Sequence, residues 1–192
     1  MGLVPESVAA SLRDALRLKR AVETGTYLGE GARRLAGLFP IVVTIELSEE
    51  LYALAAQALA AYPNVEVVLG DSRSELERIV DPAQPTLYFL DGHWSAGSTA
   101  GEDAECPVLE ELDAIARGHA DDCVVIDDAR LFAAPPPPPH DPRHWPSLTQ
   151  ILDVFRATRS NHFVTVVEDQ IMAVPFGAKD IVACYAARRR TA

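Results

Sequence analysis

The stretch AVETGTYLGEGARRLA, residues 21–36, joins an apolar run that ends in an acid to a helix-like pattern. Gly25, Gly29 and Gly31 lie in the turn between them. Glycines at a strand-to-helix turn let the main chain approach a ligand closely. Their spacing differs from the GxGxxG order that binds a dinucleotide pyrophosphate. The turn therefore favours a ligand without phosphates, with the Glu23 carboxylate suited to a cationic amino group. The alternative is a tight turn that only needs small residues.

The composition indicates one globular domain, residues 1–192. The 192 residues are 48% hydrophobic and 23% charged, and the net charge is -11. Such a charge argues against nucleic acid or an anionic membrane as the partner, because phosphate binding needs a basic surface. No apolar run could span a bilayer, and the first residues are too interrupted for a signal peptide, so we expect a cytoplasmic protein. The three cysteines form no CxxC pair, and we expect reduced thiols.

Short apolar runs rich in β-branched residues alternate with helical patterns along the chain. This alternation predicts an α/β, doubly wound, Rossmann-like fold with a mostly parallel sheet and helices on both faces. Two final runs with almost nothing between them predict a C-terminal antiparallel hairpin, which makes seven strands. The expected strands are 19–24, 41–47, 65–70, 86–91, 123–128, 162–169 and 170–176.

Local signals refine this outline. Ser72 with Glu75, and Ser147 with Gln150, predict capping boxes at two helix starts.

The segment AAPPPPPHDPRHWP, residues 133–146, favours an extended polyproline conformation. It is either an inert surface linker or a lid, because it follows a strand whose end should face the ligand.

Acids also end the next two strands. Glu46 ends the second, where a carboxylate can accept hydrogen bonds from ribose hydroxyls, and Asp71 with Ser72 ends the third, where an adenine edge could be read. Helix capping would explain Asp71 and Ser72 without a ligand. It does not explain Glu46, because Ser48 can cap the helix that follows.

The motifs ETGTYLGEG, TIELS, VLGDS and FLDGH together resemble those of class I S-adenosylmethionine-dependent methyltransferases, over nearly the whole chain. The resemblance implies S-adenosyl-L-methionine (SAM) as the cofactor. Its methionine end would lie at the glycine turn, its ribose at Glu46 and its adenine beside Asp71. The cofactor-binding residues implied in this way are Glu23, Gly25, Thr26, Gly29, Glu46, Leu47, Asp71, Ser72 and Asp91.

A second group follows the fourth and fifth strands. Asp91 and His93 come after one, and Asp127 and Asp128 after the other. If the strands are neighbours, the carboxylates repel, and a divalent cation such as Mg²⁺ would relieve the repulsion. The arrangement resembles metal-dependent O-methyltransferases, including those that act on sugar hydroxyls of antibiotics. That resemblance implies metal ligation by Asp91, Asp127 and Asp128.

His93 replaces the aspartate proposed as general base in the sugar enzymes, and histidine suits that role near neutral pH. The alternatives are that His93 is structural, that Asp127 or Asp128 caps a turn, and that Asp91 binds substrate without a metal. Glu102, Asp103 and Glu105 belong to a polar run and are expected in solvent.

The sequence therefore favours a Mg²⁺-assisted O-methyltransferase for a hydroxylated small molecule, with His93 and Asp91 as the catalytic residues. One rival is a nicotinamide-dependent oxidoreductase, which the glycine spacing and the terminal hairpin disfavour. The other is a non-catalytic subunit that keeps the cofactor pocket. A homodimer is expected if a second copy covers the site.

Overall fold

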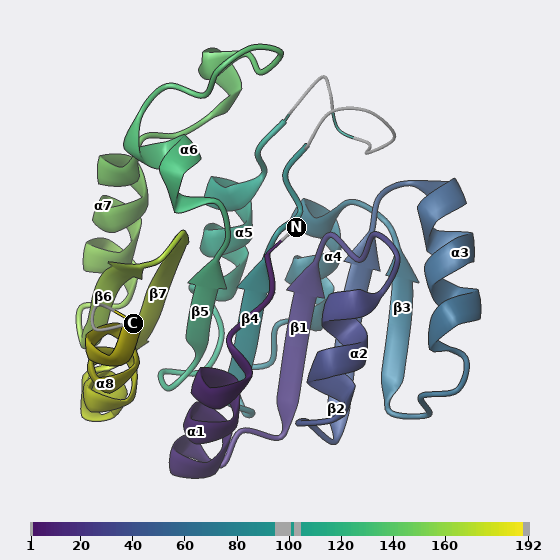
Figure 1. Ribbon diagram of the computed structural model, residues 1–192, viewed down its shortest axis with the longest axis horizontal. Coiled ribbons are helices and arrows are strands. Elements are labelled where there is room, and N and C mark those ends of the chain that lie inside the picture. The colour runs from purple at the N-terminus through teal and green to yellow at the C-terminus, as the bar shows by residue number, and fades with distance from the viewer. Residues whose placement is uncertain (1, 95–100, 102–104, 190–192) are drawn as a thin grey trace.

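The computed structural model describes residues 2–94, 101 and 105–189. Glu102 and Asp103, which the sequence places in solvent, lie outside these residues. Within the described part of the chain, seven strands form one sheet in the order β3-β2-β1-β4-β5-β7-β6 (Figure 1). The strands are β1 Arg20–Thr24, β2 Ile41–Glu46, β3 Val65–Leu69, β4 Thr86–Leu90, β5 Cys123–Ile126, β6 His162–Val167 and β7 Gln170–Pro175.

The direction of the strands confirms the predicted architecture. Strands β1 to β5 are parallel, and β7 runs antiparallel to both of its neighbours, β5 and β6. Only Glu168 and Asp169 separate β6 from β7, which leaves no room for a crossover helix. The two strands therefore form the expected C-terminal hairpin.

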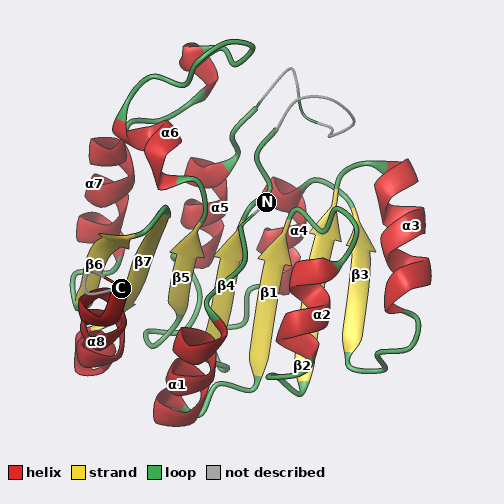
Figure 2. Cartoon of the chain, viewed as in Figure 1, coloured by secondary structure: helices red, strands yellow, loops and turns green. Residues whose placement is uncertain are grey.

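Helices cover both faces of the sheet (Figure 2). One face packs against α1, α2, α3 and α8, and the other against α4, α5, α6 and α7. The helical patterns of the sequence, at 31–39, 48–62, 72–80, 107–118 and 147–158, predict α2, α3, α4, α5 and α7 but not α1, α6 and α8. Their bounds are α1 Glu6–Leu16, α2 Glu30–Ala36, α3 Glu49–Leu59, α4 Ser72–Ile79, α5 Val108–Ile115, α6 Ala129–Ala133, α7 Leu148–Thr158 and α8 Lys179–Arg189.

The central strands are buried on both faces, which explains their continuous apolar sequences. Every residue of β4 and β5 is buried, and their side chains enter the two cores alternately. Among the described residues, none of the helices is both long enough and apolar enough to cross a membrane.

Helix caps confirm one predicted capping box and contradict the other. Ser147 and Gln150 exchange side-chain and backbone hydrogen bonds at the start of α7, as predicted. At α4 the cap is Asp71, whose carboxylate accepts a hydrogen bond from the backbone N–H of Arg73 at 2.9 Å. Ser72 is already the first helical residue, so its hydroxyl cannot cap, and the predicted Ser72–Glu75 box is wrong.

The strand order places the site. The chain moves outward from β1 to β3 and then returns to β4, on the other side of β1. Ligands of doubly wound sheets bind beyond the carboxyl ends of the strands at such a reversal. In Figure 1 these ends point upward, and the chain before α1 rises in front of the sheet to reach them.

Candidate functional site

The turn after β1 needs glycine for conformation and for space. Gly25 and Gly29 have φ angles of 81° and 80°, a region that favours glycine. A Cβ atom on Gly25 would lie 2.3 Å from the carbonyl oxygen of Asp91. The glycine turn therefore contacts the turn after β4 directly, and a larger residue at position 25 would separate them.

Glu23 lies beneath this turn with 2% of its surface exposed. Its carboxylate accepts a hydrogen bond of 2.7 Å from the Thr44 hydroxyl, which lies 2.7 Å from the hydroxyl of Thr26. A Cβ atom on Gly31 would lie 1.9 Å from the carboxylate, so the third glycine makes room for Glu23. Burial raises the pKa of Glu23 to about 8, although the Thr44 bond opposes the shift.

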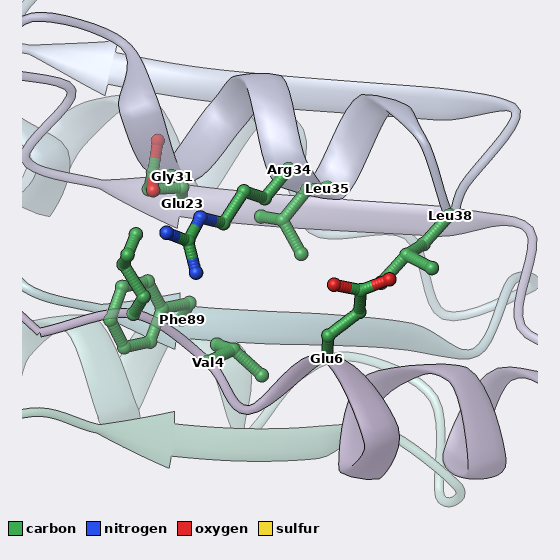
Figure 3. Close-up of a pocket in the computed structure, with 9 residues that line it drawn as sticks. Val4, Glu6, Glu23, Gly31, Arg34, Leu35, Leu38 and Phe89 are labelled. Atoms are coloured by element: carbon green, nitrogen blue, oxygen red, sulfur yellow. The ribbon is translucent and has the colours of Figure 1, made fainter.

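Glu23 also lines a small cavity between α1, α2 and β4. Figure 3 shows its carboxylate beside Gly31, with the Arg34 side chain extending into the same space and Phe89 on the opposite side. The cavity combines a buried acid with a cationic group and apolar walls. Glu23 is thus below the glycine turn and away from open solvent.

Glu46 joins the turns after β1 and β2. One carboxylate oxygen accepts the backbone N–H of Tyr27 at 2.8 Å, and the other accepts that of Ser48 at 2.9 Å. Only 6% of Glu46 is exposed, whereas the adjacent Leu47 is 46% exposed. Each carboxylate oxygen has a second lone pair that could accept a bond from a ligand hydroxyl.

The turn after β3 lies next to a buried acid in α5. Asp71 caps α4 and also pairs with the Arg73 guanidinium, which lowers the pKa of the carboxyl. Ser72 and Thr24 lie close enough to Glu111 for their hydroxyls to stabilise its charged form, but burial dominates and raises the pKa of Glu111 to about 7. Glu111 is 1% exposed, and one of its oxygens has no hydrogen-bond partner among the described residues.

Three predicted residues cluster beyond β4 and β5. One ligand atom each from Asp91, His93 and Asp128 lies within 4.8 Å of the others. His93 Nε2 is 2.7 Å from Asp128 Oδ2 and 3.8 Å from Asp91 Oδ1. The second carboxylate oxygen of Asp91 is buried without a partner in the described part of the chain.

The charges of this cluster depend on one another. Burial raises the pKa of Asp91 to about 7; the charge of His93 opposes this, and the charges of Asp127 and Asp128 add to it. Burial disfavours charged His93, but the hydrogen bond to Asp128 and the nearby carboxylates outweigh it and raise the pKa. Burial also opposes ionisation of Asp128, yet His93 and Arg130 hold its pKa down at about 2.

Asp127 has different partners. Its carboxylate accepts the backbone N–H of Gly2 at 2.8 Å and the side-chain N–H of Gln170 at 3.1 Å. Gln170 also donates to the carbonyl oxygen of Leu3 at 3.2 Å. The predicted third metal ligand is thus hydrogen-bonded to the segment before α1 and to β7, and it is absent from the three-residue cluster.

Comparison with known proteins supports the fold. No family model and no curated protein sequence matches this chain. The O-methyltransferase TomG of Streptomyces achromogenes, solved with SAM, is 19% identical over 88% of this chain and 78% of its own, with a TM-score of 0.63. A putative caffeoyl-CoA O-methyltransferase from Staphylococcus aureus is 15% identical over 88% of this chain and 82% of its own, with a TM-score of 0.64. An O-methyltransferase from Bacillus cereus, solved with S-adenosylhomocysteine (SAH), is 21% identical over 88% of this chain and 80% of its own, with a TM-score of 0.59.

The chain has the class I methyltransferase fold. Its glycine turn, Asp71 and the pair Asp91 and His93 follow strands at the carboxyl edge of the sheet, where β2 ends in Glu46, and Glu23 lies near the end of β1. The fold brings Asp91, His93 and Asp128 together.

Two acids of this methyltransferase fold were missed as site residues. Glu111 shares the buried face of α5 with Val108, Leu112 and Ile115. A carboxylate at a helical spacing from apolar residues is the signal that could have revealed it. Glu105, expected in solvent, is 3% exposed. The expectation is wrong because backbone and side-chain donors from residues 140–145 surround its carboxylate, which no local pattern reveals.

Proposed function

We propose that this chain transfers the methyl group of SAM to a hydroxyl of a small molecule, with assistance from a divalent cation such as Mg²⁺. The observation that carries the proposal is the contact between the two halves of the site. Gly25, in the cofactor turn, lies against the carbonyl of Asp91, and Asp91 belongs to the cluster with His93 and Asp128. A cofactor at the turn would therefore present its methyl group beside an acid–base cluster.

The cofactor would use the predicted residues. Glu23, Gly25, Thr26 and Gly29 form the turn at its methionine end, and Glu46 with Leu47 would hold the ribose. Asp71 and Ser72 would flank the adenine, and Asp91 would lie at the methionine end beside Gly25. Solved proteins of the same fold contain bound SAM or SAH, which supports this cofactor.

The chemistry of the cluster suits a cation. Two carboxylates and an imidazole converge, and Asp91 keeps a buried oxygen without a partner in the described chain. Oxygen ligands of this kind suit Mg²⁺ or Mn²⁺. We assign ligation to Asp91 and Asp128, with Asp127 as the third ligand once its bond to Gly2 is exchanged. When bound, the cation supplies a positive charge that lowers the pKa of an acceptor hydroxyl.

His93 is the proposed proton acceptor. In the neutral tautomer that donates Nε2–H to Asp128, Nδ1 carries the lone pair that would accept the hydroxyl proton. The charge of a bound cation would favour this neutral form by offsetting the carboxylates that raise the pKa of His93. The carboxylate of Asp128 then stabilises the imidazolium that forms and holds the ring in one orientation. The fold would align the hydroxyl oxygen with the methyl–sulfur bond, and this alignment supplies much of the rate enhancement.

Calorimetric titration with SAH, with and without Mg²⁺, tests the proposal. We expect one saturable site per chain, weakened in the Glu46→Gln variant because a carboxylate that can accept ribose hydroxyls is lost. Glu49→Gln, three residues further on and exposed, is the matched control. Asp91→Asn should abolish any gain in affinity from Mg²⁺.

A folded protein that binds no SAH in either buffer contradicts the proposal. In that case, titration with NAD would test the oxidoreductase alternative, whereas a non-catalytic subunit that keeps the cofactor pocket would still bind SAH. Gel filtration of the same samples tests whether a second copy covers the site, since that arrangement requires a dimer.

A further inference from the structure

Glu105 is a buried carboxylate that joins the proline-rich segment, residues 133–146, to the body of the protein. Trp145 Nε1 donates to one of its oxygens at 2.6 Å, and the backbone N–H of Asp141 donates to the other at 2.8 Å. His140 Nδ1 lies 3.0 Å from the oxygen that Trp145 contacts. All three partners belong to the proline-rich segment, so one acid determines where this part of the segment lies.

The same side chains reach His93. The Trp145 ring meets the His93 ring edge to face, with 5.3 Å between centroids, and Phe132 packs against Trp145 at 5.6 Å. The His140 ring packs between Trp145 and Trp94, with its centroid 5.2 Å from that of Trp145 and 5.5 Å from that of Trp94. The His93 ring therefore has Asp128 at one nitrogen and an aromatic group against its side.

Glu105 also acts through the main chain. Its carbonyl oxygen accepts the backbone N–H of Trp94, the residue after His93, at 2.7 Å. This bond restrains the backbone that carries His93, while the Trp145 indole restrains the ring. Two independent contacts thus lead from one residue to the same imidazole.

We propose that Glu105 is a positioning residue that fixes His93 through Trp145 and Trp94, and that this makes the proline-rich segment a wall of the site. Residues behind a ligand or a general base often orient it, and their loss weakens metal binding by about 10- to 100-fold. The proposed effect on cation binding rests on the proposed function of the Asp91–His93–Asp128 cluster. The proposed effect on the geometry of His93 does not.

The geometry is tested by NMR on Glu105→Gln and Glu105→Ala. In the wild-type protein the Trp145 indole N–H should exchange slowly with solvent, and the His93 ring protons should show a ring-current shift from Trp145. Glu105→Ala should abolish both signatures, and Glu105→Gln, which keeps one acceptor oxygen, should partly restore them. His93→Gln assigns the histidine signals, and Trp145→Phe keeps an aromatic ring while it removes the N–H.

Arg143→Ala is the matched control. Arg143 lies in the same segment, its side chain is exposed, and it pairs with Asp141 rather than with Glu105. It should leave both NMR signatures at their wild-type values. Unchanged His93 signals in a folded Glu105→Ala protein would overturn the proposal.

Binding of Mn²⁺ and of SAH to the same variants separates positioning from general damage. Glu105→Ala should weaken Mn²⁺ binding by about 10-fold or more and leave SAH affinity unchanged. Among the described residues, the side chains of Glu46 and Asp71 bond to Tyr27, Ser48 and Arg73, which lie outside the proline-rich segment. An equal loss of both affinities would overturn the positioning role. If the wild-type protein binds SAH but no Mn²⁺, the metal part of the proposed function fails, and the NMR result alone decides the role of Glu105.

Discussion

The buried acid Glu23 should make the stability of the protein depend on pH. Its pKa rises from 4.5 to about 8 because the carboxyl is removed from water in the folded state. An acid with a raised folded pKa keeps its proton when folded and releases it when unfolded. Below the pKa of the unfolded chain, Glu23 therefore does not reduce the free energy of unfolding. As the pH rises from that pKa towards the pKa of the folded protein, Glu23 lowers the free energy of unfolding.

The size of the effect follows from that difference in pKa. Each unit corresponds to about 1.4 kcal/mol, so the full penalty is about 5 kcal/mol above pH 8 and about 3 kcal/mol at neutral pH. Domains of ordinary stability unfold with about 5–15 kcal/mol, so the penalty is large enough to measure. Glu23→Gln removes the titrating group and can still accept the hydrogen bond from Thr44.

The assay is urea unfolding of both proteins, followed by circular dichroism, from about pH 5 to about pH 8. The free energy of unfolding of the wild type, relative to Glu23→Gln, should fall by about 4 kcal/mol over this range. Glu6→Gln removes an exposed carboxylate that lines the same cavity and controls for the loss of one negative charge. If the free energies of unfolding of the wild type and Glu23→Gln change with pH in parallel, the reasoning is refuted, because Glu23 would then be ionised in the folded protein.

Two further substitutions test other parts of the structure. Gly25→Ala should lower the free energy of unfolding by about 1–3 kcal/mol, since its φ is positive and the new Cβ would meet the Asp91 carbonyl. Gly37→Ala, at an ordinary helical conformation, should change it little, and a small effect of both in chemical denaturation would contradict this account. Asp122→Ala should cost about 3–5 kcal/mol in the same assay, because the Arg159 guanidinium 3.1 Å away would remain buried without its counter-ion. A loss below about 1 kcal/mol would mean that the pair behaves as an exposed one.

Much of the fold could be predicted from sequence because its signals are local. The apolar runs at β4 and β5 mark strands buried on both faces, and the short gap between β6 and β7 dictates a hairpin. The resemblance at the glycine turn and at DGH placed the site at the carboxyl edge. Helix α8 was missed because its apolar residues do not form a clear stripe along one face, and the Ser72 cap was wrong because Asp71 competes one residue earlier.

The partners of individual acids could not be predicted. Asp127 and Asp128 are adjacent in sequence, yet one contacts Gly2 and Gln170 and the other contacts His93. Asp128 also adopts a left-handed conformation, with φ of 55°, that no short sequence pattern here predicts. Glu105 has its main partners about 35–40 residues away, so its burial depends on tertiary packing that no short window contains.

The hydrogen bond between Gly2 and Asp127 has a practical consequence for anyone who expresses this protein. An affinity tag joined before Gly2 would emerge beside Asp127, within reach of the proposed cation ligands. A polyhistidine tag there could itself bind the added metal and imitate a native site. A tag placed after α8 would also begin near the carboxyl edge of the sheet, because Arg189, the last residue of α8, pairs with Glu168 in the turn between β6 and β7. A tag at either end should therefore be cleaved before the titrations with Mg²⁺ and Mn²⁺.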